Sequence, residues 1–328
     1  MRKHLLPFSF KYGALLFIGL VILFFSLYNQ YFFTYSNLTD ILRSISIVTF
    51  VAIGVTISLL VDGFDLSVSA TVSLSTVITA SLMVWYEMPL VVVLIVPIAV
   101  GALIGLINSL LIVKIRIPDL LATLSVMYLV NGIHKNYTAG YSVYSHMPMP
   151  DGSTAPGEMS KAFLWIGQGK LLGIPFPVVL MVVAVAAVHV FFKYTRWGRQ
   201  MIMTGGNEEA ARLSGVKVKK IRMYAYVASG IFASIGGILF ASRIGSGQID
   251  AGAPMLMESV AAVFVGYSVF AAGRPNIIGT FFGAILMGVL VNGLTMMNVK
   301  YYQTDIVKGL VLIVALAVTF IHLNRRKA

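Results

Sequence analysis

The chain has 328 residues, of which 58% are hydrophobic and only 11% charged, and its mean hydropathy is +0.89. A typical soluble domain carries about 25% charged residues, so this composition leaves too little polar surface for a large soluble enzyme. The net charge of +12 indicates basic loops at a membrane surface more than nucleic-acid binding. The chain has no cysteine, so disulfide and thiolate chemistry are excluded.

Ten apolar segments are long enough, or nearly so, to cross the bilayer, which takes about 20 residues of helix. They occupy residues 13–28, 45–61, 66–86, 90–113, 118–138, 175–193, 223–242, 255–271, 276–298 and 303–322. The basic N-terminus shows no obvious small-residue cleavage site, which favours a retained first span. The sequence therefore predicts an all-α polytopic membrane protein of about ten transmembrane helices, with residues 1–328 forming a single transmembrane domain.

The basic residues predict the orientation of these spans. With ten spans and a cytoplasmic N-terminus, 17 of the 24 Lys and Arg residues fall on the cytoplasmic side and 7 on the outer side. Lys and Arg accumulate in cytoplasmic loops. We therefore expect both termini and the charged loop 194–222 to be cytoplasmic, and the loop 139–174, rich in Tyr, Ser, Pro and Gly, to be extracytoplasmic.

A first polar interruption, DGFDLSVS at 62–69, separates the second and third apolar segments. An Asp in hydrocarbon costs about 2.5–3.5 kcal/mol on insertion scales, so it is expected to be capped, exposed to water or functional. Asp65, followed by LSVSAT, has the pattern of an N-cap for the third span. Two interpretations remain open, an interfacial turn with a helix cap and a broken segment near a transport path.

Small residues recur four positions apart inside several spans. GALIGLINS (101–109), SGIFASIGGI (229–238) and GTFFGAILMGVLVNG (279–293) all follow this pattern. Such faces let helix backbones approach closely, so we expect them to pack the helices of one bundle.

A second polar interruption lies in the loop 194–222, where GGNEEAARLSG at 205–215 has the features of a capped helix. Asn207 can cap the N-terminus, and Glu208 and Glu209 fall in the first turn, where the helix dipole favours acids. Ser214 and Gly215 have the pattern of a C-cap. The pattern predicts a helix of two to three turns over 204–215, whereas a loop that only fixed topology would need just its basic residues.

The sequence offers no constellation for catalysis or metal binding. The five His residues have no partner at ligand spacing, and no G-x-x-x-x-G-K-[ST] motif is present to hold ATP. A ladder of mid-membrane carboxylates, common in ion-coupled carriers, is also lacking. We therefore expect a protein that is not an enzyme and binds no cofactor of its own.

Five stretches together resemble the monosaccharide (ribose-type) permeases of ATP-binding-cassette importers. EAARLSG (209–215) is similar to their cytoplasmic E-A-A-x-x-x-G element, and DGFDLS (62–67) to their G-G-I-D-L-S-V-G. FFTYSNLTDILR (32–43), IPDLLATLSVM (117–127) and AAGRPNIIGTFFGAILMGVLVNGL (271–294) resemble further family patterns. The chain departs from the family, which usually has Gly, at Asp62, Ser69 and Ala271–Ala272, and these departures bear on the substrate more than on the class.

The resemblance implies a type II-like importer permease of the bacterial cytoplasmic (inner) membrane that moves a monosaccharide or related small polar solute by alternating access. The implied partners are two cytoplasmic ATPase subunits, which use ATP and Mg²⁺, an extracytoplasmic solute-binding protein that would meet loop 139–174, and a second permease copy or paralogue. ATPase coupling would fall to Gly205, Asn207, Glu208, Glu209, Ala210, Ala211, Arg212, Ser214 and Gly215. Candidates for the solute path are Asp62, Asp65, Ser67, Asn108, Asn131 and Asn292.

Other functions and cargoes stay open at this point. An ion-coupled secondary carrier for a small polar solute would need an acid such as Glu258 or Asp305 to face the pathway. An intramembrane enzyme would need a nucleophile–base pair that the sequence lacks. The cargo of an importer could be a pentose or hexose, a furanose-type signalling molecule or a nucleoside.

Overall fold

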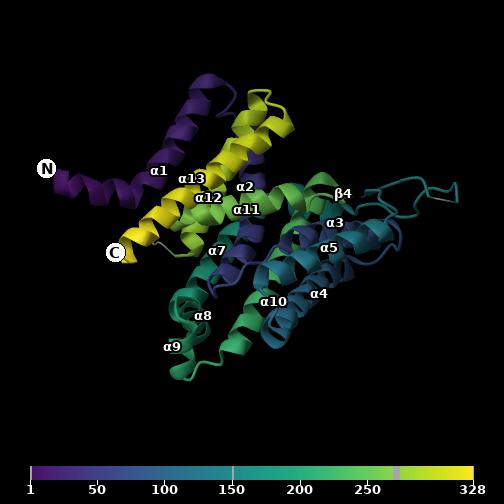
Figure 1. Ribbon diagram of the computed structural model, residues 1–328. Helices are drawn as coiled ribbons and strands as arrows, with labels where there is room; N and C mark the ends of the chain where they lie inside the picture. Colours follow the sequence, from purple (N-terminus) through teal and green to yellow (C-terminus); the bar gives the residue numbers. More distant parts are fainter. Residues whose placement is uncertain (1, 150, 269–273, 328) are drawn as a thin grey trace.

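The computed structural model describes residues 2–149, 151–268 and 274–327, so the Ala271–Ala272 pair lies outside the described residues. Helices make up most of the described chain (Figure 1). They are α1 (Arg2–Tyr28), α2 (Tyr35–Leu59), α3 (Val68–Val84), α4 (Leu90–Ser109) with its π-helical continuation η1 (Leu110–Ile115), α5 (Asp119–Tyr137), α6 (Lys161–Gln168), α7 (Phe176–Tyr194), α8 (Arg196–Gly206), α9 (Glu208–Leu213), α10 (Val218–Ile244), α11 (Gly252–Ser268), α12 (Ile277–Met296) and α13 (Tyr301–Lys327). The predicted all-α class is confirmed.

Each of the ten predicted apolar segments falls on a helix, although 269–271 lies outside the described residues. Among the described residues, five helices are long and apolar enough to cross a membrane: Tyr35–Leu59, Leu90–Ile115, Phe176–Tyr194, Val218–Ile244 and Ile277–Met296. Three shorter apolar helices, Leu15–Tyr28, Val68–Val84 and Gly252–Tyr267, accompany them. The total of ten spans and the cytoplasmic position of both termini stay predictions.

The predicted outer loop 139–174 is partly ordered, which the sequence did not indicate. Strand β1 (Val143–Tyr144) pairs antiparallel with β4 (Ser246–Gly247), and β2 (Lys170–Leu171) forms a hairpin with β3 (Ile174–Pro175). Helix α6 docks on the end of α10, where the Gly167 N–H donates to Ser242 Oγ and that hydroxyl donates to Phe163 O, both at 2.6 Å. The loop is therefore tied to the end of one of the long helices.

Helix α10 lies at the centre of the bundle and contacts α4, α2 and α3. Two of the predicted small-residue faces meet here. A Cβ added at Gly101 of α4 would overlap Ser234 Oγ and the Gly230 carbonyl of α10, and one added at Gly230 would overlap the Gly101 carbonyl. The two backbones are close enough that only glycine fits at the crossing, as expected for small residues at membrane helix interfaces.

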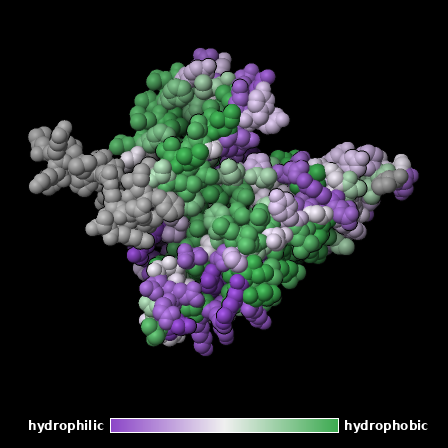
Figure 2. Space-filling view, viewed as in Figure 1, coloured by the Kyte–Doolittle hydropathy of each residue, from purple (hydrophilic) through white to green (hydrophobic). Residues whose placement is uncertain are grey.

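The outer surface has an apolar band bordered by polar regions (Figure 2). Hydrophilic residues gather over α8 and α9 at the lower end, over the loop between α5 and α6 on the right and at the top of the view, with hydrophobic surface between them. Large apolar side chains, among them Ile95 and Leu103 on α4 and Val182 on α7, are more than half exposed. A soluble protein rarely exposes so much contiguous apolar surface, whereas lipid accommodates it.

Candidate functional site

Helix α9 is a short, capped helix that projects at the polar lower end of the molecule (Figure 1). The side chain of Asn207 accepts a hydrogen bond from the Ala210 N–H at 2.9 Å, satisfying one of the free donors of the first turn. Gly215, with φ +80°, follows the C-cap in the left-handed conformation that glycine adopts most readily. The predicted caps are thus present at both ends.

The helix is shorter than predicted. It covers Glu208–Leu213, six residues, while Thr204, Gly205 and Gly206 belong to the end of α8. Asn207 alone separates the two helices, and the Gly205–Gly206 pair lies inside α8. Gly205 lies against the end of α2, since a Cβ there would overlap the Leu60 carbonyl, and this close approach explains its small side chain.

One side of α9 is buried and the other is free. Ala211 is 1% exposed, whereas Leu213 is 80% exposed. Ala210, Arg212 and Ser214 are also exposed. The capped helix thus carries an apolar tip that the rest of the described chain leaves uncovered. Leu213 was missed by the sequence analysis because its exposure is decided by the packing of Ala211.

A cluster of charged and hydroxyl groups joins α9 to the beginnings of α5 and α10. Arg222 of α10 donates two hydrogen bonds to the carboxylate of Asp119, at 3.0 and 2.7 Å, and lies 3.5 Å from Glu208 of α9. Tyr226 donates to the same carboxylate at 2.7 Å. A Cβ at Gly63 would come within 2.9 Å of Asp119 Oδ2, so this cluster also touches the break between α2 and α3.

A second polar cluster is buried next to the same break. Asp65 is 1% exposed and accepts hydrogen bonds from Ser67 Oγ at 2.6 Å and from Ser229 Oγ at 2.8 Å. Asn108 donates to Ser67 Oγ at 2.7 Å. Three of the predicted path residues are thus brought together, but they bind one another and α10. Their fully buried contacts link the break to α4 and α10.

The expectation that Asp65 is the N-cap residue of the third span is wrong. Helix α3 begins two residues later than this predicts, at Val68, with Ser67 in the capping position and no side-chain cap bond. Asp65 instead accepts from the Ser67 N–H at 2.9 Å, which stabilises the turn before the helix.

The remaining path candidates lie apart from this cluster. Asp62 is exposed, with φ 58°, on the α2 side of the break between α2 and α3. Asn131 is half-buried on α5, and Asn292 of α12 donates to Asn37 of α2 at 2.8 Å. The contact of Asn292 therefore joins two helices.

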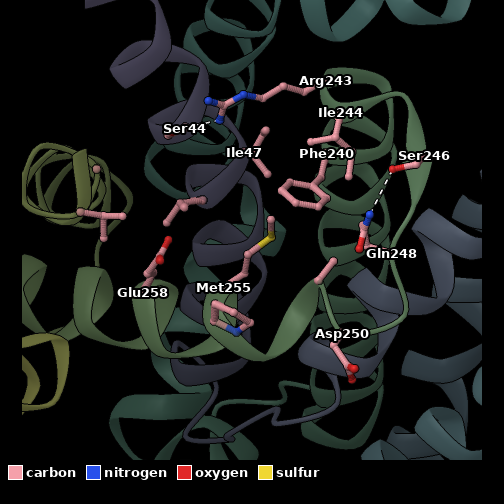
Figure 3. A pocket seen from close by; sticks show the side chains of 15 residues that line it. Ser44, Ile47, Phe240, Arg243, Ile244, Ser246, Gln248, Asp250, Met255 and Glu258 are labelled. Carbon is pink, nitrogen blue, oxygen red and sulfur yellow. Dashed lines mark hydrogen bonds between the residues drawn. The ribbon is translucent and has the colours of Figure 1, made fainter. Parts of the chain in front are cut away.

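A cavity of about 660 Å³ lies between α2, the end of α10, β4, α11 and α12 (Figure 3). Phe240, Ile244 and Met255 contribute apolar walls, and Arg243, Gln248 and Glu258 lie around them. Most small-molecule sites are mainly apolar cavities with a few polar groups and volumes of about 300–1,000 Å³. No pattern in the sequence predicts this cavity, because its lining comes from helices that are distant in the chain.

The acids named for an ion-coupled carrier share one lysine. Lys308 of α13 lies 2.8 Å from Glu258 Oε1 and 3.6 Å from Asp305 Oδ1. Glu258 lines the cavity, whereas the Asp305 side chain is 67% exposed. Glu258 is thus already compensated by a positive charge.

Comparison with known proteins places the chain in a family. The family model for the branched-chain amino acid transport system / permease component matches residues 37–316. The chain belongs to this family.

Several curated permeases are similar to the chain over most of its length. The ribose import permease protein RbsC of Escherichia coli (strain K12) is 37% identical over 287 residues, covering 88% of this chain and 86% of the relative. That of Bacillus subtilis (strain 168) is 33% identical, covering 97% and 94%. The galactose/methyl galactoside import permease protein MglC of E. coli (strain K12) is 32% identical, covering 97% and 96%. No solved structure matches.

These matches confirm the resemblance to ribose-type permeases. The permease is a transport subunit of an import system of the ATP-binding-cassette type, and it is not an enzyme. It is a multi-pass protein of a bacterial cytoplasmic membrane. The family is the permease component of a multi-subunit system, so this chain works together with ATPase and solute-binding partners.

Proposed function

We propose that the permease moves a monosaccharide, ribose-like in size and polarity, into the cytoplasm when two cytoplasmic ATPase subunits hydrolyse ATP·Mg²⁺. A solute-binding protein would deliver the sugar at the outer side, and a second copy of the permease or a paralogue would complete the pathway. The sugar class is supported by the ribose and galactose relatives, which match nearly the whole chain. A furanose-type signalling molecule or a nucleoside has the same hydroxyl-rich chemistry and is an outcome of the uptake test below.

The observation that carries the coupling role is the projecting, capped α9 with its 80% exposed Leu213. ATPase subunits would bind this tip together with the exposed residues Asn207, Glu208, Glu209, Ala210, Arg212, Ser214 and Gly215. Gly205 and the buried Ala211 would hold the helix against the bundle. Binding a short rigid helix costs little conformational entropy, so movement of the ATPase subunits would pass directly to α9.

Two contacts would carry that movement into the membrane. Glu208 and Arg222 connect α9 to Asp119. On α10, Tyr226 and Ser229 are three residues apart and therefore lie on one face, where Tyr226 binds Asp119 and Ser229 binds Asp65. A shift of α9 would thus reach the α2–α3 break. Alternating access requires an element of this kind, which has two arrangements and whose equilibrium between them the partner subunits can shift.

An ion-coupled carrier is the less favoured function. It would need Glu258 or Asp305 to bind and release an ion in the pathway, and both acids contact Lys308. The relatives are import permeases of ATP-binding-cassette systems.

The test is sugar uptake into proteoliposomes that contain the permease, its ATPase subunits and its binding protein. Labelled ribose, galactose and uridine are offered with internal ATP, with ADP, and with ion gradients but no ATPase. We expect uptake only with ATP. Replacing Leu213 by Glu should abolish it, whereas Tyr301→Glu, at a residue that is 81% exposed at the start of α13, should leave coupling unchanged. Uptake driven by an ion gradient without ATPase subunits would overturn the proposal.

A further inference from the structure

Both acids that line the cavity are already paired with a lysine. Lys308 binds Glu258 at 2.8 Å, and Asp250 is paired with Lys135 at 2.7 Å. Arg243 donates to Ser44 Oγ at 2.7 Å. An ionised amino acid would need a free carboxylate for its ammonium group, and neither lining acid among the described residues is free to supply one. The cavity therefore offers no free acid to a cationic group, whereas hydroxyl groups can bind the donors and acceptors that remain.

The polar groups that remain available match hydroxyl groups. Lys308 uses only Oε1 of Glu258 among the described contacts, so Oε2 can accept a hydrogen bond. The Gln248 amide both donates and accepts, as its contacts with Ser246 and Ser142 show. The Arg243 guanidinium has further donors beyond the one on Ser44. A hydroxyl can donate and accept at once, so a polyol can bind all three groups.

The arrangement in Figure 3 places these groups on different sides of the apolar wall. Arg243 comes from the end of α10, Gln248 from the segment after it and Glu258 from α11. In Figure 3, Gln248 lies to the right of Phe240, Glu258 to the left of Met255, and Arg243 above them. A solute of several hydroxyls could lie against the ring and reach both sides, whereas an alcohol with a single hydroxyl could not.

We propose that this cavity binds a neutral, polyhydroxylated solute during transport, with Glu258, Gln248 and Arg243 as its polar contacts and Lys308 as the positioning residue for Glu258. The proposal rests on the proposed sugar-import function and names its binding site. Lys308, 8% exposed at its side chain, offsets the cost of burying the Glu258 carboxylate. The site is small and its contacts are few, which suits a solute that must leave again.

The absence of cysteine from the chain allows a direct binding test on the full-length permease in nanodiscs. Ile244 lines the cavity and is 40% exposed, so Ile244→Cys introduces one thiol without removing a polar contact. Its rate of modification by a methanethiosulfonate reagent is measured with ribose, galactose or leucine present. A sugar at ten times its Kd should slow modification about tenfold, and leucine should have no effect. Leu172→Cys, outside the cavity, should be modified at the same rate throughout.

Second substitutions on the Ile244→Cys background identify the contacts. Glu258→Gln and Gln248→Ala should each raise the sugar concentration that gives half-protection by about tenfold, as the loss of one hydrogen bond predicts. Asp305→Asn removes a charge that also contacts Lys308 but does not line the cavity, and we expect a change of less than about threefold. Size-exclusion profiles show whether each variant is folded.

Equal modification rates with and without sugar in the folded Ile244→Cys protein would overturn this assignment, as would protection by leucine alone. Protection that is unaffected by both Glu258→Gln and Gln248→Ala would also overturn it, since the sugar would then bind elsewhere. The labelling needs no ATPase subunit, so a negative result with normal ATP-driven uptake rejects the binding site alone. Loss of ATP-driven uptake with intact protection rejects the import function alone.

Discussion

Nη2 of Arg222, in the second turn of α10, contacts both carboxylate oxygens of Asp119, the first residue of α5. The side chains are 20% and 17% exposed, so the pair is shielded from much of the screening that weakens surface salt bridges. Glu208 of α9 contacts the same arginine at 3.5 Å. The pair is thus the point at which the projecting helix meets the bundle.

Breaking this pair should impair coupling more than assembly. Asp119→Asn or Arg222→Gln leaves one half-buried charge without its partner, and we expect the unfolding free energy to fall by about 1–3 kcal/mol and ATP-driven uptake to fall at least about tenfold. Thermal melts in detergent and proteoliposome uptake measure the two effects. Combining Asp119→Arg with Arg222→Asp should recover part of the loss. If uptake stays normal in both single variants, the pair has no coupling role.

The cap of α9 should determine how well the helix is ordered. Asn207→Ala removes the acceptor for the Ala210 N–H, which costs about 1 kcal/mol. We expect faster amide exchange over 208–213 and weaker binding of the ATPase subunits. Asn207→Asp keeps an acceptor and should behave like the unmodified permease. Equal exchange in the Ala and Asp variants would contradict a capping role.

The crossing of α4 and α10 should tolerate no added methyl group. Gly230→Ala places a Cβ into the Gly101 carbonyl, and overpacking of this kind costs about 1–3 kcal/mol. The matched control is Gly132→Ala on α5, where nothing lies within 4 Å and alanine should stabilise the helix by up to about 1 kcal/mol. Detergent melting temperatures should therefore move in opposite directions. A similar change in both variants would show that the crossing is looser than described.

Asp65 should be required for stability, in contrast to the nearby Asp62. Asp65→Ala leaves the donors of Ser67, Ser229 and Asn108 without their shared acceptor, a loss of about 1–3 kcal/mol for each buried group that stays unsatisfied. Asp65→Asn keeps one acceptor and should lose less. Asp62 is exposed, so Asp62→Gly, which suits its positive φ, should not lower the melting temperature. A melt unchanged by Asp65→Ala would refute the structural role.

Some of the fold and the site could be predicted from the sequence. Apolar segments of sufficient length predict helices without knowledge of their neighbours, because in lipid every backbone group must bond within its own segment. The stretch NEEAARLSG predicts a short capped helix without knowledge of its neighbours, because capping contacts join residues only a few positions apart. The basic residues predict orientation because the bias in short loops is a local count.

Only the tertiary structure decided which polar residues meet. Asp65, Asn108 and Ser229 come from three separate elements, and their contacts depend on how α10 packs against α4 and the α2–α3 break. The same packing leaves Leu213 exposed and Ala211 buried, and it forms the cavity that joins Glu258 to Gln248 and Arg243. Local sequence determined the helices and the caps of α9, because helix hydrogen bonds and capping contacts join residues only a few positions apart in the chain. The pairing of distant polar groups depends on the approach of whole helices, which no local pattern encodes.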